Sequence, residues 1–257
     1  MAGEFIWYEL LTTDLEKSAS FFAGLLDADV LRTDDDEAPS YFIAAKGTDS
    51  PLFGLVPMRG GEGRRSHWIG YMMVDDLAQA LALVEESGGA VHALSDDEEG
   101  RGPDDPKYAV VTDSQGAVIT LHERVDGAFS QDSSPEPGRL AWVELQTTDR
   151  HASNELYQQL GGFQMGPEHV RGEEGHAHGI FRGGRLVGLV RDLPAGSPVP
   201  PNWVYYLRVP DLDRAIAHAR QLGGFMYEDP AEVDGGKRAL LLDPTGAPVA
   251  LWAATTG

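Results

Sequence analysis

The sequence contains one unit twice, and this repeat constrains the fold more than any other feature. Three segments recur at an offset of 135 residues, and a fourth recurs five residues early, so that one gap is enough to align the two copies. Self-similarity kept in register over most of a chain indicates a duplicated domain. The matching segments are Trp7–Asp14 with Trp142–Asp149, Val74–Leu77 with Val209–Leu212, Gly88-Gly89 with Gly223-Gly224, and Asp113–Gly116 with Asp243–Gly246.

Composition limits the kind of chemistry that the chain can carry. With 257 residues, 42% of them hydrophobic, two copies predict two compact domains that each bury a core. The absence of cysteine excludes disulfides, thiolate metal ligands and cysteine nucleophiles. The net charge of −21, from 41 acidic and 20 basic residues, argues against nucleic acid or an anionic membrane as a partner.

The local sequence also bears on the cellular location of the protein and on two runs of acidic residues. The first residues lack the basic and apolar regions of a signal peptide, and no apolar run approaches the roughly 20 residues that span a bilayer. We therefore expect a cytoplasmic protein. Asp34–Glu37 and Asp96–Glu99 are interpreted as solvated loops, because neither run has the alternating oxygen ligands and turn glycine of a calcium loop.

The first half of each copy predicts a strand, a helix and further strands. Phe5 to Leu11 is rich in aromatic and aliphatic residues, which favours a strand. Thr13 and Glu16 have the spacing of a capping box and predict that a helix begins there. An apolar stripe at helical period supports this helix, and two strands are expected after it, with one more short strand near Val30. The stripe is Leu15, Ala19, Phe22 and Leu26, and the two strands are Tyr41–Ala45 and Leu52–Pro57.

The second half of each copy repeats this order. Trp68–Val74 predicts a strand, the spacing of Leu77, Leu81 and Val84 predicts a helix, and Gly88-Gly89 predicts its left-handed end. A hairpin is expected around the turn that begins at Asp113. The prediction is an α+β protein of four βαβββ modules near residues 3–60, 66–124, 138–194 and 201–254. The predicted domains are residues 1–124 and 138–257, joined by the Ser-, Asp- and Pro-containing linker 125–137.

Tandem βαβββ modules with a helix-opening Asp and a closing Asp-Pro-x-Gly hairpin resemble the vicinal oxygen chelate superfamily of glyoxalases, bleomycin-resistance proteins and extradiol dioxygenases. The resemblance covers nearly the whole chain. The Trp-x-Glu-Leu-x-Thr-Thr-Asp opening is similar to the two-domain glyoxalase-like branch that includes the Cfp30B-type proteins. The resemblance implies two tandem glyoxalase-like domains, each with a cup-shaped mixed sheet.

The resemblance also implies metal-ligand positions, which this sequence does not fill. Enzymes of the superfamily usually hold a divalent metal in the cup with His, Glu or Gln on the first and last strands of each module. Indole, alkyl and methyl groups supply no such donors, so we expect no metal and no other cofactor. The corresponding residues are Trp7, Ile69 and Thr120 in the first copy and Trp142, Val204 and Ala250 in the second, with Leu52–Leu55 and Leu186–Leu189 for the remaining ligand.

Strand alternation places a different set of groups in the predicted cups. Glu9 and Glu144 share a face with the two tryptophans, and a carboxylate among aromatic rings is a candidate general base whose pKa burial would raise. An aromatic cleft with a few polar groups is typical of a small-molecule pocket. Alternatively, the rings are core and the carboxylates bond to backbone. The candidate ligand-binding residues are Trp7, Tyr71, Thr120, His122, Trp142, Tyr206 and Trp252.

His176-Ala177-His178 is a second candidate site. In an extended segment its two imidazoles share one face, and that spacing can bind zinc, although short His pairs in polar loops usually bind nothing specific. A relocated metal site would combine both histidines with Glu144.

Three functional classes therefore stay open. The first hypothesis is a metal-independent protein that binds an apolar or aromatic small molecule. The second is a metal-independent isomerase or lyase in which Glu9 or Glu144 is the general base. The third is a metal-dependent glyoxalase or dioxygenase that uses His176 and His178. The expected partner is a small-molecule ligand, with no nucleic acid and no membrane, and the expected assembly is a monomer or a homodimer.

Overall fold

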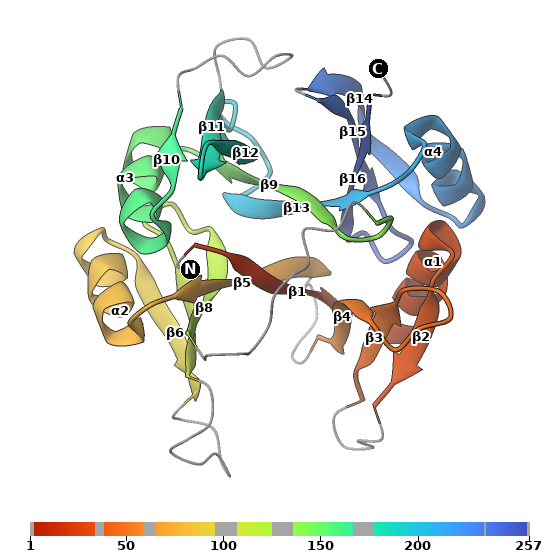
Figure 1. Ribbon diagram of the computed structural model, residues 1–257, viewed down its shortest axis with the longest axis horizontal. Helices are drawn as coiled ribbons and strands as arrows, with labels where there is room; N and C mark the ends of the chain where they lie inside the picture. Colours follow the sequence, from red (N-terminus) through yellow and green to blue (C-terminus); the bar gives the residue numbers. More distant parts are fainter. Residues whose placement is uncertain are drawn as a thin grey trace. The chain divides into compact units, whose positions relative to one another are not determined.

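The computed structural model describes residues 3–33, 39–58, 65–95, 107–124, 136–166, 177–233 and 235–255. Within these ranges the chain forms four successive βαβββ modules (Figure 1). The first contains β1 (Phe5–Thr12), α1 (Leu15–Leu26), β2 (Asp29–Arg32), β3 (Tyr41–Ala44) and β4 (Pro51–Pro57). The second contains β5 (His67–Val74), α2 (Leu77–Glu86), β6 (Ala90–Leu94), β7 (Tyr108–Thr112) and β8 (Val118–Glu123).

The second copy repeats the same order of elements, as the sequence predicts. The third module contains β9 (Leu140–Thr147), α3 (Arg150–Gly161), β10 (Gln164–Met165), β11 (Ala177–Arg182) and β12 (Arg185–Asp192). The fourth contains β13 (Asn202–Arg208), α4 (Leu212–Gln221), β14 (Phe225–Val233), β15 (Gly236–Leu242) and β16 (Pro248–Ala254).

Each copy forms one mixed sheet of eight strands. The strand orders are β2-β3-β4-β1-β5-β8-β7-β6 and β10-β11-β12-β9-β13-β16-β15-β14, which are the same order in the two copies. Within a module the first and last strands pair in parallel, as β1 does with β4 and β5 with β8, whereas the later strands form antiparallel hairpins. The fold is therefore α+β, with four βαβββ modules in two mixed sheets, as the sequence predicts.

Packing groups the modules differently from the sequence. One compact unit, unit 1, consists of Met1–Trp7, Ile69–Asp132 and Val143–Val204, and the other, unit 2, of Tyr8–Trp68, Ser133–Trp142 and Tyr205–Gly257. In Figure 1, α2 and α3 lie side by side in unit 1, as α1 and α4 do in unit 2. The proposed division into residues 1–124 and 138–257 stays a prediction. Residues 125–135 of the predicted linker lie outside the described residues.

The four helices of the described chain each begin after an aspartate. The side chains of Asp14, Asp76, Asp149 and Asp211 each accept a hydrogen bond from a backbone N–H of the first turn. An Asp at this position satisfies a donor that has no partner within the helix. The predicted capping box that starts at Thr13 is therefore wrong by one residue.

Helix ends follow the predicted glycine signal in the second and fourth modules. Gly88 and Gly223 have φ angles of 87° and 89°, a left-handed conformation that glycine adopts without a steric penalty. Asp27 has the same role after α1, at φ 48°. The chain can therefore turn sharply from each of these helices into the next strand.

Aromatic side chains fill the cores. In unit 2, Tyr8 stacks on Tyr205 with ring centroids 5.9 Å apart, while Phe22 and Phe53 meet edge to face at 5.2 Å. In unit 1, Trp203 packs against Phe5 at 5.1 Å. Tyr8 directly follows the candidate site residue Trp7, and Tyr205 directly precedes the candidate site residue Tyr206. Because side chains alternate along a strand, each of these two core rings lies on the face opposite to its neighbouring candidate residue.

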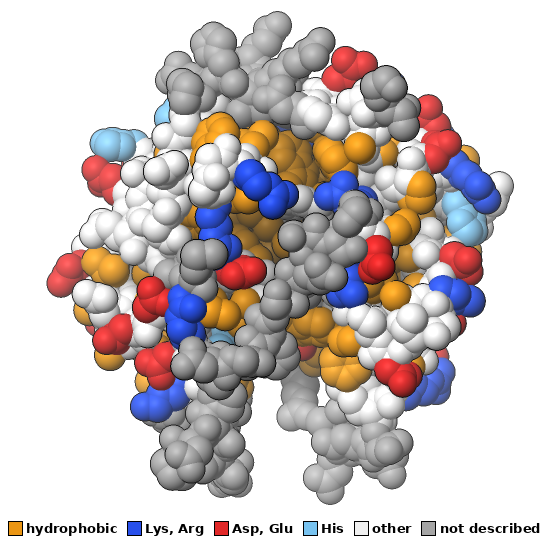
Figure 2. Space-filling model, in the orientation of Figure 1, with side chains coloured by type: hydrophobic (Ala, Val, Ile, Leu, Met, Phe, Trp, Pro, Cys, Tyr) orange, Lys and Arg blue, Asp and Glu red, His pale blue; other side chains and the backbone are white. Residues whose placement is uncertain are grey.

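Acidic side chains are scattered over the visible face of the molecule rather than gathered in one patch (Figure 2). The acidic runs Asp34–Glu37 and Asp96–Glu99, predicted to be solvated loops, lie outside the described residues. No helix in the described part of the chain is long and apolar enough to cross a membrane.

Candidate functional site

The positions at which the resemblance implies metal ligands carry no suitable donors. In the first copy they hold the indole of Trp7, the alkyl group of Ile69 and the hydroxyl of Thr120. Thr120 and its register partner Tyr71 lie side by side, and the Thr120 hydroxyl is buried without a hydrogen-bond partner among the described residues. Within those residues no group of three or more His, Asp or Glu side chains is arranged to hold a metal. The donor set at these positions does not fit a divalent ion.

The second copy offers no better metal ligands. Trp142, Val204 and Ala250 stand at the corresponding places, and all three are buried. Their side chains provide one indole N–H donor and no acceptor. A cation would find no ligand on these three side chains.

Glu144 lies fully buried in unit 1, but it is not an isolated acid. Its Oε2 accepts a hydrogen bond from Nη2 of Arg191 at 2.8 Å, and its Oε1 accepts one from Nε2 of Gln146 at the same distance. Asn202 donates onward to the side-chain oxygen of Gln146 at 3.4 Å. A guanidinium and an amide donor both stabilise the ionised carboxylate. Both of these contacts of Glu144 are with side chains.

Glu9 has a different environment in unit 2. Its side chain lies over Gly54, its register partner on β4, and a Cβ added to that glycine would come within 2.9 Å of the Glu9 Cγ. Glu144 is instead paired with Leu189. The sequence alignment that matches Gly54 with Gly188 is therefore displaced by one residue. The two candidate bases are not in equivalent surroundings.

His122 and Tyr108 form a stacked pair in unit 1. Their rings are nearly parallel, with centroids 6.4 Å apart, and His122 is buried. Its Nδ1 lies 2.7 Å from the backbone carbonyl of Glu123, and because a carbonyl oxygen can only accept, Nδ1 donates this hydrogen bond. By strand alternation His122 shares the predicted face of β8 with Thr120.

Trp142 and Tyr206 are in contact in unit 2. Their ring centroids are 5.3 Å apart at an interplanar angle of 60°. The Trp142 side chain is only 7% exposed, and its Nε1 has no hydrogen-bond partner among the described residues. Tyr206 is fully buried, and its hydroxyl accepts a hydrogen bond from Nη1 of Arg238 at 3.2 Å. Arg238 is itself paired with Glu228 at 3.2 Å.

Sequence reasoning missed the arginines beside these residues. Arg191, Arg208 and Arg238 lie on β12, β13 and β15, and none belongs to a recognisable motif. One signal was available: Arg208 follows Tyr206 by two residues, so alternation places both on one strand face. The contacts of the other two arginines depend on strand register, which local sequence does not reveal.

The His176–His178 hypothesis has limited structural support. His176 lies outside the described residues. His178 Nδ1 is 2.8 Å from the side-chain nitrogen of Asn154, on α3. A pocket of about 470 Å³ in unit 1 is lined in part by these two residues, and its lining includes neither Trp142 nor Glu144.

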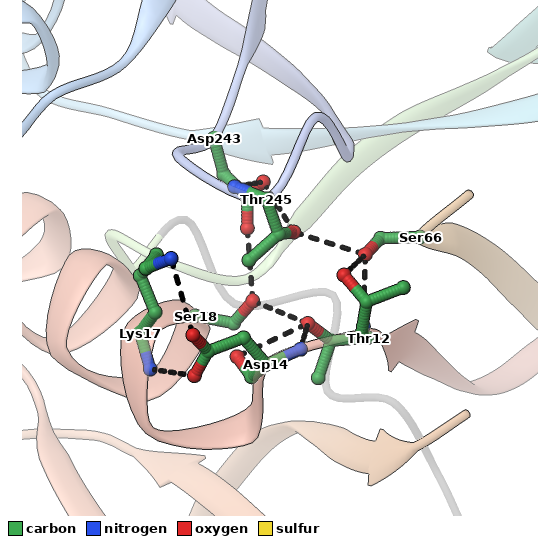
Figure 3. Close-up of polar contacts among 8 residues, drawn as sticks. Thr12, Asp14, Lys17, Ser18, Ser66, Asp243 and Thr245 are labelled. Atoms are coloured by element: carbon green, nitrogen blue, oxygen red, sulfur yellow. Dashed lines mark hydrogen bonds and ion pairs between the residues drawn. The ribbon is translucent and has the colours of Figure 1, made fainter. Parts of the chain in front are cut away.

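A buried polar network joins the first and fourth modules inside unit 2 (Figure 3). Asp243 accepts a hydrogen bond from Ser18 on α1 at 2.9 Å, and Ser18 lies 2.7 Å from Thr12. The Thr245 hydroxyl donates to Ser66 at 3.0 Å. Asp243 also accepts backbone hydrogen bonds from its own turn, so its carboxylate has enough partners to be buried. These groups satisfy one another, and the network holds the two modules together.

Unit 1 contains the counterpart of this network. Asp113 accepts a hydrogen bond from the hydroxyl of Tyr157 on α3 at 3.2 Å, and Trp203 donates to that hydroxyl, also at 3.2 Å. The turn Asp of each copy thus contacts the helix of the module that shares its unit. Its role in the fold is to join modules that are distant in sequence.

Comparison with known proteins supports the same fold. A model of the Glyoxalase/Bleomycin resistance protein/Dioxygenase superfamily matches residues 5–121. The anthracycline biosynthesis protein DnrV of Streptomyces peucetius is 28% identical over 94% of this chain and 90% of its own length. The putative glyoxylase CFP32 of Mycobacterium bovis is 34% identical over 46% of each chain.

Two solved structures are similar at low sequence identity. The Mn(II)-bound glyoxalase from Novosphingobium aromaticivorans has a TM-score of 0.62 at 12% identity, and the match covers 98% of this chain and 82% of that one. The 2,2',3-trihydroxybiphenyl 1,2-dioxygenase from Sphingomonas wittichii has a TM-score of 0.64 at 17% identity, and the match covers 99% and 91%. Identities this low support the shared fold alone.

Proposed function

We propose that this chain, whose residues 5–121 match the model of the glyoxalase/bleomycin resistance protein/dioxygenase superfamily, is a member of that superfamily and binds a small apolar or aromatic molecule without using the metal site of the superfamily's enzymes. The proposed binding residues are those of the predicted face: Trp7, Tyr71, Thr120, His122, Trp142, Tyr206 and Trp252.

The observation that carries this proposal is the indole N–H of Trp142. It is buried and has no acceptor among the described residues, although buried donors are nearly always paired. Leaving such a donor unpaired costs about 1–3 kcal/mol. A ligand oxygen would pair it, and the adjoining ring of Tyr206 would supply an aromatic contact.

The donor set supports metal independence. The first- and last-strand positions carry Trp, Ile, Val, Thr and Ala; the Thr120 hydroxyl is the one oxygen among these side chains, and a divalent ion needs several oxygen or nitrogen ligands. Binding should therefore survive treatment with a chelator.

The relatives suggest one chemical class to try. DnrV is named for anthracycline biosynthesis, and its similarity extends along 94% of this chain. An anthracycline is accordingly a reasonable second probe beside a simple aromatic one.

The test is a fluorescence titration with phenylnaphthylamine, a neutral aromatic probe, before and after EDTA. We expect saturable binding that EDTA does not change, and a loss of about tenfold in affinity for Trp142→Ala or Trp7→Ala, because each change removes an aromatic contact surface. Unchanged affinity in both variants would refute the assignment of the face, and loss of binding in EDTA would refute metal independence.

A metal-independent isomerase or lyase is the second candidate, and the buried Glu144 is the observation that favours it. Glu144→Gln would then abolish turnover of a bound compound with little change in affinity. Both carboxylate oxygens of Glu144 already accept hydrogen bonds, from Arg191 and from Gln146, so binding without turnover remains our first choice.

A further inference from the structure

Three side chains form a row across adjacent strands of unit 2. Arg208 on β13 is paired in register with Trp252 on β16, and Trp252 is paired with Arg238 on β15. Residues directly opposite each other on neighbouring strands stand on the same face of the sheet. The guanidinium of Arg208 lies over the Trp252 ring, 4.7 Å from its centroid. We name these three residues the arginine–tryptophan row.

The row continues into the aromatic pair already described. Tyr206 precedes Arg208 by two residues on β13, and its hydroxyl accepts a hydrogen bond from Arg238 at 3.2 Å. Trp142 packs on Tyr206 at 5.3 Å. Two cations and three aromatic rings therefore adjoin one another within a single unit.

The charge of this surface is not balanced. Arg238 is paired with Glu228, but Arg208 forms no ion pair with any residue that the structure describes. The Nε of Arg208 is buried and has no hydrogen-bond partner among the described residues. Burial lowers the pKa of Arg208, as expected where no anion compensates the lost hydration.

The Nε of Arg208 and the Nε1 of Trp142 are both donors without a partner among the described residues. Trp142 packs on Tyr206, and Arg208 follows Tyr206 by two residues on β13. A guanidinium prefers planar anionic oxygens and also stacks on aromatic rings. Both preferences are met by one kind of ligand.

We propose that this surface binds a planar aromatic molecule that carries an anionic oxygen, a carboxylate or a phenolate. The ligand's oxygen accepts hydrogen bonds from Arg208 and Trp142, and its ring lies against the tryptophans. This inference rests on the proposed function, because it names the class of small molecule that the second copy binds.

The first copy supplies an internal comparison. The residues at the repeat positions of Arg208, Trp252 and Arg238 are Met73, His122 and Tyr108, and they too are register partners across three strands. This row has no guanidinium. The anion preference should therefore belong to the second copy alone.

The experiment compares naphthoate with its uncharged amide, naphthamide, by isothermal titration calorimetry of the full chain. We expect naphthoate to bind about tenfold more tightly than naphthamide. Arg208→Met, which introduces the residue type of the first copy, should remove that preference, because it weakens naphthoate binding much more than naphthamide binding. Trp142→Phe keeps an aromatic ring but removes the N–H, and should weaken both ligands because each has an oxygen acceptor.

The control variant is Arg214→Met, which removes the same charge from an exposed position of α4 in the same unit. It should leave both affinities unchanged, and circular dichroism will check that every variant is folded. Equal affinities of the two ligands for the wild-type protein would overturn the inference, as would equal losses in Arg208→Met and Arg214→Met. If Arg208→Met does not fold, an unaltered affinity of both ligands in Trp142→Phe also overturns it.

The titration also separates this inference from the proposed function. If phenylnaphthylamine binds but naphthoate shows no advantage over naphthamide, only the ligand class is wrong. If neither naphthyl compound nor phenylnaphthylamine binds, the proposed function fails as well.

Discussion

At the scale of single residues, neighbours that are distant in sequence decide what a buried polar group can do. Glu144 and Trp142 share a strand face, as the sequence predicts, but Arg191 is 47 residues away from Glu144 and reaches it only through the pairing of β12 with β9. The sequence identifies the acid without identifying its counterion. The same holds for Trp142, because only the packed structure reveals that its N–H has no acceptor among the described residues.

Asp113 yields a prediction about pH. Burial raises the pKa of Asp113, although backbone N–H groups of Ala117 and Gln115 and the hydroxyl of Tyr157 oppose this effect. A raised pKa means that the folded state disfavours the charged form, so the contribution of Asp113 to stability is largest below its unfolded pKa of about 4 and is lost as pH rises through the folded value. Asp113→Asn keeps an acceptor for the turn and does not ionise.

The melting temperature of Asp113→Asn minus that of wild type should therefore be more positive at pH 7 than at pH 4. Asp113→Ala, which removes every side-chain acceptor, should be destabilised at both values by roughly 1–3 kcal/mol. Differential scanning calorimetry at the two pH values measures this. A difference between Asp113→Asn and wild type that does not vary with pH would contradict the prediction.

At the scale of elements, local signals predict most of the helices and strands. Four helix-opening aspartates and the Gly88 and Gly223 stops occur where the periodic patterns begin and end. These features depend on neighbours within a few residues, so they are visible in the sequence. The error at Thr13 has a physical reason: its hydroxyl lies 3.2 Å from that of Ser66, and Asp14 has the cap position.

Gly89 yields a prediction about the turn from α2 to β6. A Cβ at Gly89 would lie 2.4 Å from the backbone oxygen of Thr112 and 2.7 Å from Val84, whereas a Cβ at the equivalent Gly224 would lie 3.0 Å from the oxygen of Ala219. Backbone atoms cannot move aside as a side chain can. Gly89→Ala should destabilise the protein by about 2 kcal/mol, and Gly224→Ala by clearly less.

Urea unfolding of the two alanine variants measures this difference. Gly47→Ala is not a suitable control, because Gly47 has a positive φ of 70° that strains alanine regardless of space. Equal losses for Gly89→Ala and Gly224→Ala would show that the close approach to Thr112 does not limit this turn.

At the scale of the whole molecule, charge is the property that composition predicts directly. A net charge of −21 disfavours the compact state through repulsion among like charges. Because 41 acidic residues face only 20 basic ones, we expect added salt to relieve a general repulsion; on the face drawn in Figure 2 the described acidic side chains form no single patch.

The melting temperature should therefore rise between about 0.05 M and about 1 M NaCl, where the screening length falls to about 3 Å. A gain of about 1 kcal/mol in the free energy of unfolding raises the melting temperature of a protein of this size by roughly 2–4 °C. An uncharged osmolyte at matched osmolality is the control, because it stabilises without screening. A melting temperature that is independent of salt would contradict this prediction.

The duplication and the four βαβββ modules can be predicted from sequence patterns, because periodicity and capping act over short distances along the chain. Which modules pack together, and which side chains meet, becomes known only from the folded chain. Asp243 reaches Ser18 across 225 residues, and Arg208, Trp252 and Arg238 meet only when three strands pair in one register. Such contacts depend on strand register and module packing, which no local pattern records.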